Sequence, residues 1–261
     1  MRAASKPDYA SWKSYFTRNQ TNFDAITWNA DAELSGDDRR LITRSLQQFQ
    51  RGEHSEGRTL LHFAKLWNAP FYTDAIELFA REEQRHAMVL ARFMKRENIA
   101  RMGSDWVDGT FRFLRKTAGL ENSVMVLITA EIIAAVYYKA LMNAAKSETL
   151  VALCRQILRD EEMHINFQSH TLNHFYERHN ALVAWLSRLA HNVLMVGTLA
   201  VVWLYHARVL RRGGYGFMRF TCEVLCEFLR SERMVMGHES ADIREANAAE
   251  LAPADVFSIS R

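Results

Sequence analysis

Two short segments combine a carboxylate and an imidazole at a spacing that suits a metal ion. Residues 83–86 and 161–164 both read Glu-x-x-His. On a helix, residues three apart lie on the same face, so each segment would direct one carboxylate and one imidazole at a common point. Two such pairs, completed by one Glu from each of two more helices, can enclose two metal ions inside a helical bundle.

Helices are expected on both sides of each segment, because apolar residues recur at spacings of three and four. The pattern predicts one helix over 37–67, a second over 70–98, a third over 120–146 and a fourth that Ser147 caps, ending near 179. Residues 102–119 read as a crossover with a short helix of its own. We therefore expect an all-α fold, a four-helix bundle with a long crossover between its second and third helices.

The spacing along the chain identifies the two further carboxylates. Helices joined by a short turn are antiparallel neighbours, and residues equally far from the turn meet. Glu53 lies 15 residues before Asn68 at the turn and Glu83 lies 15 after it, while Glu131 lies 16 residues before Ser147 and Glu161 lies 14 after it. Both pairs are thirty residues apart in the numbering. Glu53 and Glu131 are therefore predicted to complete the site.

Other polar residues near these positions are open to more than one interpretation. Glu56 lies three residues after Glu53 and shares its face, so it is the alternative ligand or a hydrogen-bond partner of one; the thirty-residue spacing favours Glu53. His170 either continues an apolar stripe or supports a ligand. Tyr138, one heptad after Glu131, is a candidate catalytic side chain. Four neighbours of the two motifs are expected to face solvent: Glu82, Arg85, Asp160 and Glu162.

The composition limits the classes of protein that fit. Only three Pro and eleven Gly in 261 residues suit long helices better than a turn-rich β fold. The net charge of +3 comes without a basic block, so no nucleic-acid partner is expected. Three Cys are too few for a disulfide framework and offer no paired zinc motif. The polar N-terminus lacks the apolar core of a signal peptide, which favours the cytoplasm.

The C-terminal third has a different character, because 182–210 is strongly apolar. It predicts a helix buried against the bundle or in a homodimer, or else a helix that makes peripheral contact with a membrane. We divide the chain into a lead-in of short helices (1–36), the bundle (37–179), apolar C-terminal helices (180–236) and a polar tail (237–261).

The stretches 82–86 and 160–164 resemble the ferritin-like superfamily of di-iron carboxylate proteins. They are most similar to its oxygen-activating branch, which includes acyl-carrier-protein desaturases, aldehyde-deformylating oxygenases, and small-molecule and tRNA hydroxylases. The resemblance covers about 37–179. It implies two iron ions, or iron with manganese, and O2 as co-substrate, with these ligands: Glu53, Glu83, His86, Glu131, Glu161 and His164.

The function that this resemblance implies is an O2-activating oxidase or oxygenase. It would hydroxylate, desaturate or cleave a small substrate of hydrophobic or acyl type, and it would need an external electron donor. The alternatives are a ferroxidase or iron-binding ferritin-like protein, a tRNA or small-molecule hydroxylase, and a helical scaffold without catalysis. A fold of this kind does not by itself decide the reaction.

Overall fold

The computed structural model describes residues 8–28, 31–54, 57–103, 109–110, 113–114 and 119–238, and among them it contains helices and no strand. The all-α prediction is confirmed. The helices are α1 (Tyr9–Arg18), the short 3-10 helix η1 (Asn19–Thr21), α2 (Gly36–His54), α3 (Arg58–Leu66), α4 (Pro70–Arg96), α6 (Gly119–Ala144), α7 (Glu148–Tyr176), α8 (Ala181–Arg212) and α9 (Phe217–Val235). Most of the predicted crossover and the polar tail lie outside the described residues.

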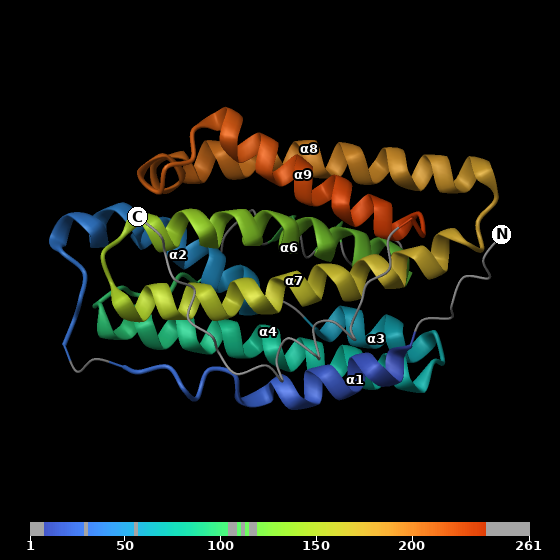
Figure 1. The fold of residues 1–261 in the computed structure, drawn as a ribbon, viewed down its shortest axis with the longest axis horizontal. Coiled ribbons are helices and arrows are strands. Elements are labelled where there is room, and N and C mark those ends of the chain that lie inside the picture. Colours follow the sequence, from blue (N-terminus) through green and yellow to red (C-terminus); the bar gives the residue numbers. More distant parts are fainter. Residues whose placement is uncertain are drawn as a thin grey trace, which may run out of the picture.

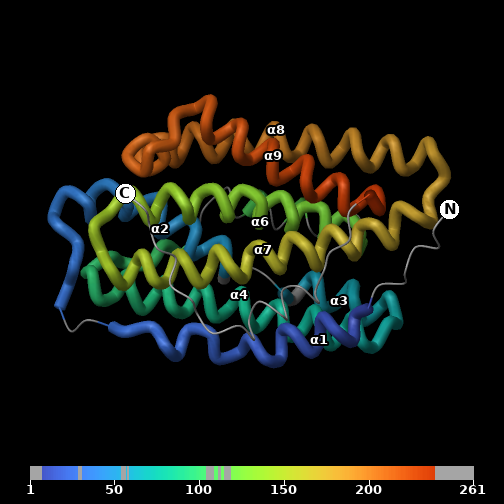
Figure 2. The backbone as a smooth tube through the Cα atoms, in the orientation of Figure 1, coloured from blue at the N-terminus to red at the C-terminus, as the bar shows by residue number. Residues whose placement is uncertain are grey.

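Four helical segments surround one interior, and the remaining helices cover them (Figure 1). Helices α6 and α7 pack side by side, α4 packs on α7 and α2, and α2 and α3 both reach α6. Helix α1 lies along the outside of α4, while α8 packs on α6 and α9 on α7 (Figure 2). The lead-in and the C-terminal helices therefore enclose the bundle from opposite sides.

The helix boundaries follow from a few local signals. The side chain of Ser147 accepts a hydrogen bond from the backbone N–H of Leu150, so Ser147 caps α7 as predicted. Pro70 occupies the first turn of α4, where its missing N–H costs no helical hydrogen bond. These two signals set where α4 and α7 begin, and with them the height of each Glu-x-x-His segment in the bundle.

The prediction of one unbroken helix over 37–67 is wrong. Two helices, α2 and α3, occupy this region, and Gly57 between them adopts φ +112°. A side chain there would strain the backbone, and a Cβ on Gly57 would stand 2.8 Å from the Cβ of Ala80 on α4. The glycine thus permits a close approach to α4 and ends the helical path. As a result Glu53 lies in the last turn of α2.

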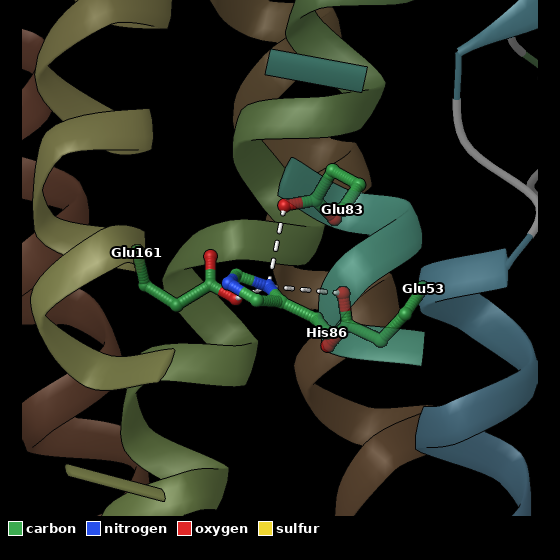
Figure 3. A group of neighbouring side chains, drawn as sticks. All are labelled: Glu53, Glu83, His86 and Glu161. Atoms are coloured by element: carbon green, nitrogen blue, oxygen red, sulfur yellow. Dashed lines mark ion pairs between the residues drawn. The ribbon is translucent and has the colours of Figure 1, made fainter. Parts of the chain in front are cut away.

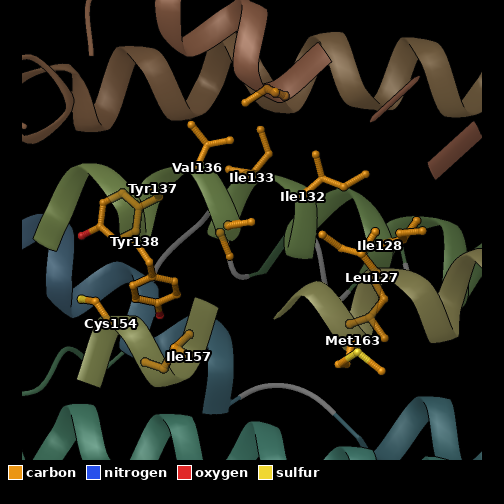
Figure 4. Packing of buried hydrophobic residues seen from close by; sticks show 14 of the residues in the cluster. Leu127, Ile128, Ile132, Ile133, Val136, Tyr137, Tyr138, Cys154, Ile157 and Met163 are labelled. Atoms are coloured by element: carbon orange, nitrogen blue, oxygen red, sulfur yellow. The ribbon is translucent and has the colours of Figure 1, made fainter. Parts of the chain in front are cut away.

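Two helices are long and apolar enough to cross a membrane, yet they are placed very differently. In α6, 89% of the most apolar window is buried, against 39% in α8. Figure 4 shows Ile128, Ile132 and Val136 of α6 inside the hydrophobic cluster. Helix α6 is therefore the core helix of the bundle. For α8, burial against the bundle accounts for only one of its faces.

Candidate metal centre

The six predicted ligands meet in the interior of the bundle. Glu53 comes from α2, Glu131 from α6, and each of α4 and α7 supplies a Glu and a His three residues apart. The side chains drawn in Figure 3 converge from three of these helices on one point. Two overlapping groups have potential ligand atoms within 4.8 Å of one another: Glu53, Glu83, His86 and Glu161; and Glu83, Glu131, Glu161 and His164.

The first group is arranged around Nδ1 of His86. This nitrogen lies 3.7 Å from Oε2 of Glu53, 3.5 Å from Oε1 of Glu83 and 3.8 Å from Oε1 of Glu161. All four side chains are at most 7% exposed, so water cannot solvate these carboxylates. Three carboxylates and one imidazole nitrogen therefore face one small buried volume.

The second group repeats this arrangement around Nδ1 of His164. This atom lies 3.0 Å from Oε1 of Glu83, 3.7 Å from Oε2 of Glu131 and 3.6 Å from Oε2 of Glu161. Glu83 and Glu161 belong to both groups, whereas Glu53 and Glu131 belong to one each. The geometry thus contains two adjacent sets of O and N donors with a shared pair of carboxylates.

Several of these buried atoms have no hydrogen-bond partner among the described residues. They are Oε1 of Glu83, Oε1 of Glu131, both carboxylate oxygens of Glu161, and Nδ1 of both His86 and His164. Leaving buried polar atoms unpaired costs about 1–3 kcal/mol each, so native proteins usually satisfy them. A cluster in which every such atom points inward fits a cation, because carboxylate oxygen and imidazole nitrogen are both metal-ligand atoms.

The outer nitrogens of the two imidazoles are held by carboxylates that the sequence analysis placed in solvent. Nε2 of His86 donates to Oδ2 of Asp160 at 3.0 Å, and Nε2 of His164 donates to Oε2 of Glu82 at 3.0 Å. Glu82 is 4% exposed and Asp160 is 1% exposed, so the prediction that they face solvent is wrong. Each carboxylate orients the imidazole of the opposite motif and turns its Nδ1 inward.

The lead-in segment explains why these two carboxylates are buried. The amide nitrogen of Asn19 in η1 donates to both Glu82 and Asp160, and that of Asn22 donates to Oδ2 of Asp160 at 2.8 Å. Gln156, one turn earlier on α7, donates to Oδ1 of Asp160 at 2.8 Å. Contacts between the lead-in and the bundle cannot be read from helical periodicity. The available signal was the one acidic residue, Glu82 or Asp160, that directly precedes each Glu-x-x-His.

The environment changes the pKa values of the site residues in a consistent way. Burial, together with the charges of Glu131 and Glu53, raises the pKa of Glu83 well above its ordinary value. Burial and neighbouring Glu131 do the same for Glu161. Burial alone would lower the pKa of His86, but its contacts with Asp160, Glu53 and Glu83 outweigh burial and raise it. Without a metal ion, protons thus occupy places that a cation would take.

One site residue, Glu53, departs from that pattern, and His164 follows it. Burial would raise the pKa of Glu53, but the nearby imidazole of His86 and other polar neighbours, among them Tyr138, lower it overall. For His164, burial would lower the pKa, while Glu83 and Glu131 raise it above the ordinary value. The pKa values of the two imidazoles are therefore both raised, whereas Glu53 ionises more readily than Glu83 and Glu161.

The other predicted site residues have separate outcomes. The hydroxyl of Tyr138 donates to Oε1 of Glu53 at 2.5 Å, so Tyr138 touches the cluster through a carboxylate. His170 is not part of either group; its Nδ1 accepts a hydrogen bond from the indole of Trp12 at 3.2 Å. Glu56 lies outside the described residues. Arg85 is half-buried and Glu162 is exposed, and neither joins the donor groups.

Comparison with known proteins leaves this site to be judged by its geometry. No model of a known protein family matches the chain, and no curated protein matches it either. The chain is thus a helical protein with buried Glu and His groups that can hold a metal ion.

Proposed function

We propose that the chain is a ferritin-like di-iron carboxylate protein that activates O2 to oxidise a small organic substrate. The observation that carries the proposal is the set of unpaired atoms, Nδ1 of two imidazoles and oxygens of three glutamates, that face one buried volume from α4, α6 and α7, with Glu53 of α2 beside them. Glu53, Glu83 and His86 would hold one ion, and Glu131, Glu161 and His164 the other. Glu83 and Glu161 belong to both groups, which supports a bridging role for them.

The charge of the donors supports metals that change oxidation state. Four ligand carboxylates offset the charge of two divalent ions, and Glu82 and Asp160 add up to two further negative charges next to the imidazoles. The surroundings therefore also suit a higher positive charge. Hard oxygen and imidazole ligands without Cys are typical of iron and manganese sites that react with oxygen.

When bound, a pair of ferrous ions supplies electrons to O2. The protein residues position these ions and keep bulk water away, because the six ligand side chains are at most 7% exposed. Asp160 and Glu82 fix the ring orientation of His86 and His164 by accepting from Nε2. Tyr138 fixes Glu53, since its hydroxyl donates to that carboxylate, and it would be the hydroxyl beside the site that moves a substrate proton.

A hydrophobic or acyl-type substrate is proposed because the helix that carries Glu131 is strongly apolar. Glu131 is flanked on α6 by buried aliphatic residues, among them Ile128 and Ile132. Apolar residues of this kind would bind a hydrocarbon chain by burying its apolar surface, and this burial contributes about 25 cal/mol of free energy per Å². An external electron donor would be needed to return oxidised iron to the ferrous form between turnovers.

Metal content and oxygen uptake test the proposal. The wild-type protein, reconstituted anaerobically with ferrous iron, is expected to hold two irons per chain and to consume O2 after rapid mixing. Glu161→Ala should abolish the paired site because both donor groups lose a carboxylate. Glu162→Ala, the exposed neighbour on the same helix, is the matched control and should behave as wild type.

Other outcomes separate the alternatives. Oxidation of many irons per chain into a mineral would assign the protein to iron storage instead. Full retention of two irons by Glu161→Ala would refute the ligand assignment. Oxygen uptake that a hydrophobic aldehyde or fatty acyl compound accelerates, with formation of an oxidised product, would support the oxygenase over a ferroxidase.

A further inference from the structure

Helix α8 presents a continuous apolar stripe on the face turned away from the bundle. Nine of the 18 large hydrophobic side chains that are exposed in the described residues belong to α8. At 100° per residue, seven of the nine fall within an arc of about 100°. The residues of this stripe are Leu182, Trp185, Leu186, Leu189, Val193, Val196 and Leu204.

The stripe is long and unbroken by polar side chains. The remaining positions of the same arc between 182 and 207, Ala200, Trp203 and Ala207, carry no charged group. From 182 to 207 the stripe extends about 38 Å at 1.5 Å per residue. Val193 is 66% exposed and Leu204 is 77% exposed, so nothing among the described residues covers it. A contiguous exposed apolar surface of this kind marks an interaction site.

The opposite face of α8 determines how the stripe is presented. His191, Met195, Val202 and Val209 are buried, and α8 packs along α6 and also reaches α2 and α9. A helix that packs on the bundle over its length cannot also cross a bilayer, because its inner face would have to leave the protein. The stripe is therefore presented side-on, parallel to the surface that receives it (Figure 1).

The charged side chains of α8 itself are all cationic. Helix α8 contains no Asp or Glu, and Arg208 and Arg211 follow the stripe at its C-terminal end, where both are exposed. The carboxylates of α9 are already paired: Glu223 with Arg219, Glu227 with Arg230, and the buried Glu232 with Arg188 of α8. An approaching surface thus meets an apolar strip with cationic groups at one end.

We propose that α8 docks this protein, lying in plane, onto a membrane surface that contains anionic lipid. An amphipathic helix binds such an interface by inserting its apolar face, while nearby Arg side chains attract anionic headgroups. A second copy of the chain fits less well. A symmetric contact of α8 with α8 would bury the stripe but offer Arg208 and Arg211 no carboxylate from the same helix. The proposal does not depend on the metal centre.

Vesicle flotation of the full-length protein tests the apolar contact. Wild type is expected to float with vesicles of phosphatidylcholine and phosphatidylglycerol. Leu186→Glu combined with Val193→Glu should remain unbound, because two charges then occupy the centre of the stripe. Leu66→Glu combined with Met88→Glu makes the same changes at exposed apolar positions on α3 and α4, and it should float as wild type does.

A second variant tests the charge contribution without disturbing the stripe. Arg208→Gln combined with Arg211→Gln should lower the partition coefficient about thirtyfold. The two Arg side chains are expected to contribute about equally to the attraction by anionic headgroups. Binding should also weaken as salt concentration rises. Equal flotation with vesicles of phosphatidylcholine alone would refute the assignment to anionic lipid.

Sedimentation velocity distinguishes the membrane from a second copy. The proposal expects a monomer in the absence of vesicles. A wild-type dimer that dissociates in Leu186→Glu with Val193→Glu, together with no flotation, would overturn the proposal and assign the stripe to self-association. Failure of wild type to float in any vesicle mixture would overturn it as well.

Discussion

The two halves of the candidate metal centre have the same ligand types but different support. Glu53, in the last turn of α2, receives a hydrogen bond from Tyr138 at 2.5 Å. Its counterpart Glu131 lies in the middle of α6, and its Oε1 has no hydrogen-bond partner among the described residues. Glu53 is thus held by a hydroxyl donor, and no such donor reaches Oε1 of Glu131 among the described residues.

The imidazoles of the two halves are supported alike. Each donates through Nε2, at 3.0 Å, to a carboxylate that immediately precedes the Glu of the opposite motif. The asymmetry therefore lies in Glu53 and Glu131. We infer that the Glu53 half binds its ion more tightly, because its terminal carboxylate is already ordered, while Glu131 retains freedom to rearrange when an ion or substrate arrives.

Removing one imidazole at a time should give the largest change in metal content and in the difference in affinity between the two halves. His86→Ala and His164→Ala are each expected to reduce the metal content from two ions to one. The ion that remains in His164→Ala should be held about tenfold more tightly than the one in His86→Ala, since it keeps the ordered Glu53. Titration with Mn(II) followed by electron paramagnetic resonance measures both. His62→Ala, on the exposed surface of α3, is the control; equal affinities in both variants would contradict the asymmetry.

Substitution of the outer carboxylates, Asp160 and Glu82, should give the next largest change in metal affinity. Each carboxylate contacts the imidazole of the opposite motif, so each substitution should weaken the ion that this imidazole binds. Asp160→Asn is expected to weaken the ion that His86 binds, and Glu82→Gln the ion that His164 binds, each by about 10–100-fold. Both substitutions keep the size of the side chain and remove its charge. Calorimetric titration with Mn(II) gives the two affinities. Glu162→Gln should leave both unchanged, and an effect of Asp160→Asn on the other half would show that these contacts do not act through the imidazoles.

The ligands could be predicted from the sequence because their spacing follows from the geometry of a helical bundle. Two antiparallel helix pairs of similar length place Glu53 with Glu83 and Glu131 with Glu161 at matching heights, and the described structure brings them together. Helical periodicity also gave the boundaries of α4, α6 and α7, as apolar positions determine which face is buried. These features depend on contacts within the bundle itself.

The features that sequence reasoning missed depend on segments outside the bundle. Glu82 and Asp160 lie off the apolar stripes, and they are buried only because Asn19 and Asn22 of the lead-in cover them. The break at Gly57 reflects its close approach to Ala80, a long-range contact that leaves no periodic signal. Likewise, the apolar sequence of α8 predicts that its surface must be buried. It does not indicate whether the bundle, a second copy or a membrane buries it.

The pH dependence of metal stabilisation follows from the pKa shifts. Glu83 and Glu161 have pKa values raised above 4.5, and His86 and His164 above 6.5. The metal-free folded chain thus binds more protons than the unfolded chain, and it loses stability as pH rises through these raised values. Glu53, with a lowered pKa, acts with the opposite sign but only below about pH 4.5.

Metal ions displace those protons, so the difference in Tm between metal-bound and metal-free protein should widen from about pH 6 to about pH 8. Scanning calorimetry with and without Mn(II) measures the difference, and a pH-stat should record proton release on binding. Glu161→Gln, which cannot ionise, is expected to narrow the difference. A difference in Tm that stays constant across this range would contradict the inference that the buried Glu and His side chains hold protons in the metal-free protein.

Tyr138→Phe should give the smallest effect and the most direct test of the asymmetry. The substitution removes only the hydroxyl that orders Glu53, which is expected to weaken the tighter ion about tenfold and so make the two affinities alike. Tyr137→Phe, at the next buried tyrosine, removes a hydroxyl that contacts Ser45 and not Glu53, and should leave the difference between the halves intact. If Tyr138→Phe weakened both ions equally, the order of Glu53 would not be what distinguishes them, and the position of α2 relative to α6 would have to account for the difference.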